Sequence, residues 1–157
     1  MQIRIIAVGK IKEDYLKQGI DDYKKRLSKY VSVNIQEVAE EKVSVRPNSE
    51  VKAKEAQKLQ KYMPEPDSWY IVALDRQGIE VSSEELAKRV ESLMIAGKSN
   101  IVFVIGGALG LDDSIIKAAD FRLSLSRLTF PHQIARFIIL EQLYRSFKII
   151  RGEPYHY

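Results

Sequence analysis

Short apolar runs alternate with longer amphipathic segments along the 157 residues of the chain. Segments rich in apolar residues predict core strands, and such segments lie at 2–8, 68–74, 101–105 and 121–125. The segment 31–36 instead alternates apolar with polar residues. It predicts a half-exposed strand near the edge of a sheet.

Helices are predicted between these strands. One opens with the capping-box spacing of Ser82 and Glu85 and closes at Gly97, a residue suited to the position after a helix. Another carries alternating charges, including Lys52, Lys54, Glu55, Lys58 and Lys61, and predicts a helix that is exposed to solvent. The predicted helices are 13–30, 51–62, 82–97, 114–119 and 133–150.

Strands that alternate with helices indicate an α/β fold, with a mostly parallel sheet and helices on both of its faces. The length suits one domain with a sizeable core. No internal repeat, low-complexity segment or linker divides the sequence. We therefore expect a single domain over 1–157.

The last predicted helix is apolar on nearly every side. A helix of this kind must be covered on more than one side, and one small domain offers limited cover. The simplest cover is a second copy of the chain, so the sequence predicts a homodimer with two-fold symmetry. The apolar residues are Ile134, Phe137, Ile138, Ile139, Leu140, Leu143, Tyr144, Phe147, Ile149 and Ile150.

The stretch 100–136 contains the candidate site. One predicted strand ends at Gly106-Gly107, with Gly110 three residues further on. The next strand leads through the loop 126–131 into the last helix. Ligands of open α/β sheets bind beyond the carboxyl ends of strands, and glycine lets a ligand approach the backbone closely. The three glycines are therefore candidate cofactor contacts, although a tight turn without a ligand explains the same pattern equally well.

Several site classes are excluded or disfavoured. No Lys-Ser/Thr pair follows Gly110, so the glycines are not a Walker loop. A dinucleotide fingerprint should follow the first strand, where only Gly9 is found. The chain has no cysteine and two histidines, which excludes disulfides and argues against a structural metal site. No apolar run approaches membrane-spanning length and the N-terminus lacks a signal-peptide pattern, so we expect a cytoplasmic protein with no membrane partner.

Basic residues gather in the last part of the chain. The net charge is only +4, but from Phe121 onward two glutamates oppose six basic residues. Most of these are arginines, which suit bidentate contacts with phosphate. A solvated helix face with a chance excess of charge is the alternative. The basic residues are Arg122, Arg127, Arg136, Arg145, Lys148 and Arg151.

Four segments are distinctive in combination: IIAVGKIKEDYLKQGIDDYKKRL, ALDRQG, FVIGGALGL and LSLSRLTFPHQIARFIILEQLYRSFKIIRGEPYHY. Together they resemble one family, the SPOUT-class ribosomal RNA large-subunit methyltransferase H family, over nearly the whole chain. The resemblance implies a deep trefoil knot in the C-terminal third. Threaded connections are rare in proteins, so a knot would not be expected without the resemblance. It also implies S-adenosylmethionine as cofactor, and ribosomal RNA as substrate, methylated at N3 of pseudouridine 1915 of the 23S RNA.

The resemblance also assigns cofactor-binding positions. Leu74, Leu128 and Phe130 would wall the adenine, although core packing is an alternative for Leu74 and Phe130. Main-chain groups at Gly106 and in the loop would contact the adenine edge and the ribose. Arg127 stands where some relatives have lysine, which keeps the charge but changes its geometry. The implied positions are Leu74, Gly106, Leu125, Ser126, Arg127, Leu128, Thr129 and Phe130.

Methylation at N3 requires removal of a proton, so a base or an anion-stabilising environment is needed. His132 and His156 can each accept a proton near neutral pH, although His132 also suits a structural role at the helix start. Arg136 or Arg151 would instead stabilise the N3 anion or bind phosphate. These alternatives stay open on sequence grounds.

The C-terminal tail, 151–157, has a composition suited to stacking on bases, because two tyrosines flank His156. Arg151, Tyr155 and His156 are therefore candidate catalytic residues, together with His132. In a dimer, this tail would reach the partner's cofactor loop. A frayed terminus is the alternative.

Two other functions compete with an RNA methyltransferase. A nucleic-acid-binding protein with a vestigial cofactor site would show a disrupted loop, whereas GGALG and SRLTFPHQ are intact. A dinucleotide-binding oxidoreductase would need the first-strand fingerprint and the acidic ribose ligand that follows it.

Overall fold

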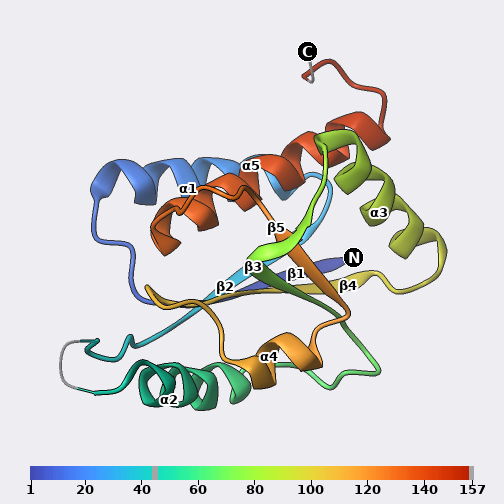
Figure 1. The fold of residues 1–157 in the computed structure, drawn as a ribbon. Coiled ribbons are helices and arrows are strands. Elements are labelled where there is room, and N and C mark those ends of the chain that lie inside the picture. Colours follow the sequence, from blue (N-terminus) through green and yellow to red (C-terminus); the bar gives the residue numbers. More distant parts are fainter. Residues whose placement is uncertain (44–45, 156–157) are drawn as a thin grey trace.

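The computed structural model describes residues 1–43 and 46–155 (Figure 1). In this part of the chain, five strands alternate with five helices, as the sequence predicts. The elements are β1 (Gln2–Val8), α1 (Asp14–Leu27), β2 (Ser32–Val38), α2 (Asn48–Gln60), β3 (Tyr70–Glu80), α3 (Ser83–Ile95), β4 (Asn100–Ile105), α4 (Asp113–Ala118), β5 (Phe121–Ser124) and α5 (His132–Ile150).

The strands form one sheet in the order β2-β1-β4-β3-β5, and every pairing between them in the described residues is parallel. The central strands β1 and β4 are almost wholly buried, which explains why their sequences are rich in isoleucine and valine. The half-exposed strand β2 lies at one edge, as its alternating pattern predicts.

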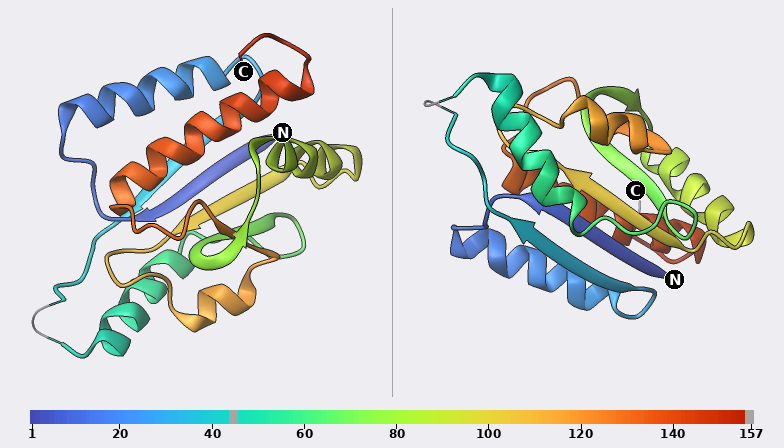
Figure 2. Two further views of the ribbon diagram at one scale, coloured as in Figure 1. Left: turned by 45° about the horizontal axis from the view of Figure 1, so that its top comes forward. Right: turned by 90° about the horizontal axis from the view of Figure 1, so that it is seen from below.

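Helices cover both faces of the sheet. Figures 1 and 2 show α1, α3 and α5 on one face and α2 and α4 on the other. Alternate residues of each central strand point to opposite faces, so Ile5 and Phe103 belong to one core and Ile6 and Val104 to the other. The predicted fold class is therefore confirmed.

Helix α3 begins and ends where the sequence predicts. The side chain of Ser82 accepts a hydrogen bond from the Glu85 amide at 3.1 Å, and the Glu85 carboxylate accepts one from the Ser82 amide at 2.7 Å. Gly97 follows the helix with a φ of 75°, a conformation that glycine adopts without strain. The sequence was sufficient to predict both ends of α3, because the capping box and Gly97 each depend on residues that are close together in the chain.

Strand β3 differs from its prediction, because it continues past Leu74 to Glu80. Leu74 and Ile79 both lie opposite Leu123 of β5, so the residues between them form a bulge. We call 75–78 the β3 bulge. A Cβ on Gly78 would lie 2.6 Å from the carbonyl oxygen of Arg122. Glycine avoids this clash because it has no Cβ. The sequence pattern missed this arrangement because it depends on a neighbouring strand.

Helix α2 is less exposed than predicted. Its mixed charges suggested a solvated helix, yet Val51, Ala56 and Leu59 pack into the core on that face of the sheet. Glu55 is also buried, with only 4% of its surface exposed. The prediction of a solvated helix was therefore wrong for one face of α2.

Helix α5 lies between α1 and α3 (Figure 2), so neighbours in the same chain cover more of it than expected. Aromatic rings join α1 to α5, with centroids 5.5 Å apart for Tyr23 and Phe137. On the other side, Ser83 of α3 donates a hydrogen bond to Gln142 at 2.7 Å. Much of the apolar surface that suggested a dimer is thus buried within the chain, and the homodimer stays a prediction.

The segment between β5 and α5 crosses a long way over the sheet. Strand β5 lies at an edge, whereas α5 begins beside the end of β1, where Gln133 donates to the carbonyl of Lys10 at 3.1 Å. Strands β3 and β4 lie between these two points. This crossing is consistent with the trefoil knot that the family resemblance implies.

Candidate functional site

The glycine turn, Gly106–Gly110, follows β4 at the carboxyl edge of the sheet. Gly107 and Gly110 form an isolated bridge, and the amide of Gly110 donates to the carbonyl of Gly107 at 3.0 Å. A Cβ on Gly106 would lie 2.7 Å from the carbonyl carbon of Gly110. The space beside Gly106 is thus filled by the turn itself rather than left for a ligand. Gly110 has a φ of 86°, and apart from its two chain neighbours no described residue lies within 4 Å of where its Cβ would be.

The β5–α5 loop, Leu125–Phe130, is fastened to the β3 bulge. Arg76 donates a hydrogen bond to the Thr129 hydroxyl at 2.6 Å. The Ser124 hydroxyl bonds to the carbonyl of Arg76 at 3.0 Å and to that of Ser126 at 3.1 Å. Within the loop, the Ser126 hydroxyl accepts from the amide of Leu128 at 3.0 Å. The β5–α5 loop and the end of β3, which follows Leu74, are therefore joined by hydrogen bonds.

The three apolar side chains predicted to wall an adenine differ in exposure. Leu74 is half-buried and packs against the core of the α1, α3 and α5 face, and Phe130 is half-buried. Leu128 is 71% exposed. Core packing explains the position of Leu74. It does not explain Leu128, a large apolar side chain that is exposed on a loop held in place by hydrogen bonds.

Two basic residues near the loop, Arg122 and Arg127, differ in how firmly other residues hold their side chains. The β3 bulge holds the side chain of Arg122, which donates two hydrogen bonds to Asp75 at 2.5 and 3.1 Å. Arg127 is 91% exposed on its side chain and makes a 3.4 Å ion pair with Glu80. An exposed pair of this kind contributes little, so Arg127 is available to an anionic ligand.

Arg136 is wholly buried and cannot bind RNA or the target base. Its guanidinium donates to Glu37 at 2.6 Å and to the carbonyls of Val8 and Gly9 at 3.2 and 2.8 Å. Such bonds compensate for the loss of water around a buried charge. The predicted role of Arg136 in stabilising an anion was therefore wrong. Sequence patterns missed Glu37, because its partner is 99 residues away.

His132 packs under the end of β1 rather than facing open solvent. A Cβ on Gly9 would lie 2.4 Å from the imidazole, so glycine there makes room for the ring. The Nδ1 atom accepts a hydrogen bond from Arg136 at 3.2 Å. Burial lowers the pKa of His132, and the charge of Arg136 lowers the pKa further. The ring is neutral near pH 7, but one of its nitrogens is already occupied, which favours a structural role.

The described part of the tail is held in place rather than frayed. Gly152 follows α5 with a φ of 65°. Glu153 then accepts hydrogen bonds from Lys148 at 2.6 Å and from the Tyr30 hydroxyl at 2.7 Å. Arg151 is exposed. His156, one of the two candidate bases, lies outside the described residues.

Tyr155 is engaged by its own chain. Its hydroxyl lies 3.1 Å from that of Tyr23 and donates to Glu141 at 3.2 Å. Its ring packs edge-on against Tyr144, with centroids 4.9 Å apart. Burial raises the pKa of Tyr155, as does the hydrogen bond with Tyr23. These contacts make Tyr155 an anchor for the tail and leave its ring poorly placed to stack on a base.

The tail and the β5–α5 loop lie at opposite ends of α5. The helix has 19 residues and spans about 28 Å at 1.5 Å per residue. The tail is also tied to α1 and α5 through Glu153 and Tyr155. A tail held in this way cannot meet the loop of its own chain.

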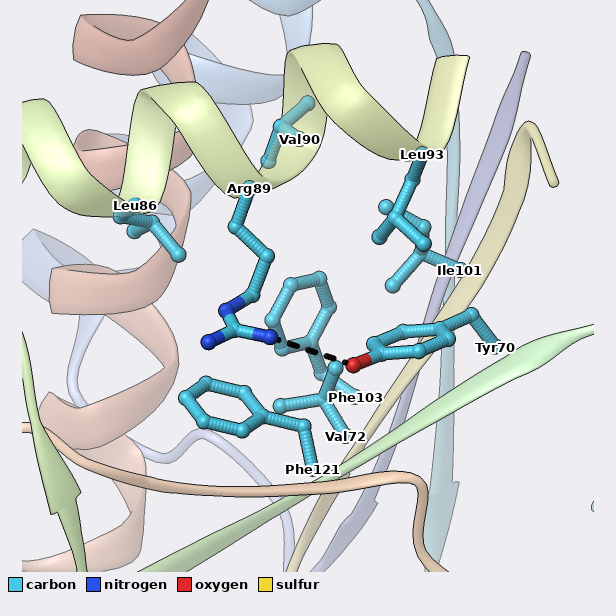
Figure 3. Close-up of a pocket in the computed structure, with 9 residues that line it drawn as sticks. All are labelled: Tyr70, Val72, Leu86, Arg89, Val90, Leu93, Ile101, Phe103 and Phe121. Atoms are coloured by element: carbon cyan, nitrogen blue, oxygen red, sulfur yellow. Dashed lines mark hydrogen bonds between the residues drawn. The ribbon is translucent and has the colours of Figure 1, made fainter. Parts of the chain in front are cut away.

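The small cavity in Figure 3 belongs to the core beneath α3 rather than to the candidate site. The Arg89 guanidinium lies 3.8 Å from the centre of the Phe121 ring and donates to the Tyr70 hydroxyl at 3.4 Å. The other lining side chains are apolar, and none of the predicted site residues is among them.

Within the described residues, no helix is long and apolar enough to cross a membrane. The same residues contain no cluster of three or more histidine, cysteine, aspartate or glutamate side chains suited to a metal ion.

A family model described as "Predicted SPOUT methyltransferase" matches residues 1–156. Ribosomal RNA large subunit methyltransferase H of Acetivibrio thermocellus is 54% identical over an alignment of 160 residues, which covers 99% of both chains. The protein of that name from Clostridium kluyveri is 49% identical with the same coverage. Among solved structures, a Legionella pneumophila methyltransferase with bound SAM aligns with a TM-score of 0.48 at 12% identity, over 94% of this chain and 66% of that one. Because the family model and these relatives match over nearly their full length, the chain belongs to the SPOUT methyltransferase family.

Proposed function

We propose that the protein is an S-adenosylmethionine-dependent methyltransferase that modifies N3 of a pseudouridine in the large-subunit ribosomal RNA. The observation that carries this proposal is the full-length match to relatives named for methylation of that RNA, at 54% and 49% identity. The position, 1915 of the 23S RNA, and the pseudouridine itself follow from the family resemblance in the sequence motifs.

The cofactor binds where the glycine turn, Leu74 and the β5–α5 loop converge at the carboxyl edge of the sheet. The outward side chain of Leu128 and the open position at Gly110 support this placement. The bonds between Arg76 and Thr129 and between Ser124 and the bulge hold the loop in one shape before the cofactor arrives. A site that is ordered in advance loses less conformational freedom on binding.

Two copies of the chain form the complete enzyme. The length of α5 and the anchored tail support this proposal, because one chain alone keeps its tail about 28 Å from its loop. A two-fold dimer brings the tail of one copy to the loop of the other. Helix α5 contributes to the interface through its half-buried outer side chains, such as Ile134 and Ile138.

The substrate is held and activated by exposed residues. Arg127 binds RNA phosphate, since its long ion pair with Glu80 costs little to release. Arg151 of the partner tail stabilises the N3 anion or binds phosphate, and His156 accepts the N3 proton. His132 and Arg136 support the end of β1 instead. Bound S-adenosylmethionine supplies an electrophilic methyl group on its sulfonium centre.

A methylation assay tests this function. Large subunits, assembled ribosomes and free 23S RNA, all from cells without the modification, would be incubated with labelled S-adenosylmethionine and the protein. We expect label in at least one of the three, at N3 of a single pseudouridine located by mass spectrometry. RNA binding without label in any of them would favour the alternative, a nucleic-acid-binding protein with a vestigial cofactor site.

A further inference from the structure

The carboxyl group of Glu55 is an unusual feature of the face opposite α5. It comes from α2 and is 4% exposed, although the helix carries several charged residues that reach solvent. Its Oε2 atom accepts a hydrogen bond from the backbone amide of Glu41 at 3.1 Å. Its Oε1 atom is buried and has no hydrogen-bond partner among residues 1–43 and 46–155. Buried polar atoms without partners are uncommon and call for an explanation.

The carboxyl group lies directly beside the glycine turn. A Cβ built on Gly107 would be 2.9 Å from Oε1 and 3.0 Å from Oε2 of Glu55, and 3.2 Å from a methyl group of Val8. Gly107 does not have a positive φ, so its backbone would accept an L side chain. The restriction to glycine at 107 therefore comes from these neighbouring side chains, Glu55 above all, and not from the conformation of the turn.

The surroundings of Glu55 favour its neutral form. Burial raises the pKa of this carboxyl group, and the negative charges of Glu40 and Glu41 raise the pKa further. The hydrogen bond from the Glu41 amide and the charge of Lys58 oppose this shift. Lys58 itself is directed elsewhere, to the Ala39 carbonyl at 3.0 Å and to Glu41 at 2.7 Å.

We propose that Glu55 is a positioning residue for the cofactor site, which sets the glycine turn by filling the space beneath Gly107 and tying it to the backbone at Glu41. The inference rests on the proposed placement of the cofactor against that turn. Glu55 does not touch substrate in this proposal. It acts through the shape of the turn, which an ionised carboxylate disturbs because its unpartnered oxygen must then find water.

A rescue experiment tests the contact. Gly107→Ala places a methyl group against the Glu55 carboxyl group, and overpacking of this size should weaken S-adenosylmethionine binding about tenfold. Adding Glu55→Ala removes the obstructing atoms, so the double variant should bind more tightly than Gly107→Ala alone. The matched control adds Glu50→Ala, an exposed glutamate of the same helix, and should give no recovery. Wild-type affinity in Gly107→Ala, or recovery equal to that of the control, overturns the proposal.

A series of affinity measurements at different pH values tests the protonation state of Glu55, with a variant that keeps the shape of its side chain. Glu55→Gln keeps the size of the side chain and its acceptor for the Glu41 amide, but it cannot ionise. As the pH rises above the ordinary pKa range of a glutamate, wild-type affinity for S-adenosylmethionine should fall at least about threefold relative to Glu55→Gln. The cofactor's own ionisation is common to both proteins and cancels in this ratio. Parallel profiles for the two proteins would overturn the proposal.

The proposed enzyme function and this inference fail in different ways. Both experiments measure cofactor binding by calorimetry and need no RNA. If the wild-type protein does not bind S-adenosylmethionine, the proposed function fails and the inference fails with it. If the wild-type protein binds it and either the rescue or the pH difference is absent, only the role of Glu55 is wrong.

Discussion

The arginines near the carboxyl edge of the sheet show how burial separates residues of one type. Arg136 is sealed against Glu37 and the end of β1, whereas Arg127 has 91% of its side chain exposed. A count of basic residues in the sequence treats them alike. Their environments give Arg136 a role in stability and leave Arg127 exposed, where the proposed contact with substrate is open to it.

We therefore expect opposite effects from two alanine substitutions. Arg136→Ala removes the partner of Glu37 and leaves a void, and should lower the free energy of unfolding by about 3 kcal/mol. Arg127→Ala should leave unfolding unchanged but raise the KM for RNA, with a smaller dependence on salt. Urea denaturation and methylation kinetics measure the two quantities. An Arg136→Ala protein as stable as wild type would show that the buried network is unimportant.

Leu128 offers a direct test of the cofactor wall. Because the side chain is 71% exposed, Leu128→Ala should leave the melting temperature nearly unchanged. Loss of its contact with the adenine should weaken S-adenosylmethionine binding about tenfold. Ile95→Ala, at an 81% exposed position of α3, is the matched control and should affect neither quantity. Equal affinities for the two variants would remove Leu128 from the site.

At the scale of elements, the sequence predicts best what is encoded locally. The capping box at Ser82 and the buried run of β4 each depend on neighbouring residues in the chain, and both predictions were right. The β3 bulge and the buried face of α2 depend on other elements. No local pattern marks Gly78 as the residue that lies against Arg122, or Glu55 as the residue beneath Gly107.

The β3 bulge should be sensitive to one methyl group. In Gly78→Ala the new atom would lie 2.6 Å from the Arg122 carbonyl oxygen, so β5 must shift. We expect a loss of stability of about 1–3 kcal/mol and weaker cofactor binding, because the β5–α5 loop is fastened to this bulge. Thermal unfolding and calorimetry give the two values. A stable variant with weakened binding would still support the link between bulge and loop, whereas unchanged binding in a destabilised variant would contradict it.

At the scale of the whole molecule, the alternation of strands and helices was enough to predict an α/β fold with a parallel sheet. The strand order β2-β1-β4-β3-β5 was not predictable from the pattern, because periodicity does not say which strands are neighbours. The sequence predicts the candidate site as a region at the carboxyl edge of the sheet, and this stays a prediction, whereas the surroundings of Arg136 and Tyr155 needed the three-dimensional contacts.

The most direct test of the account mixes two inactive variants. One carries Leu128→Asp in the loop, and the other carries Arg151→Ala and His156→Ala in the tail. Each alone should methylate ribosomal RNA at least about a hundredfold more slowly than wild type. Unfolding and refolding them together in equal amounts should restore about a quarter of wild-type activity, because half of the dimers then contain one intact loop facing one intact tail. Mixed dimers that form but stay inactive would contradict a site shared between two copies of the chain.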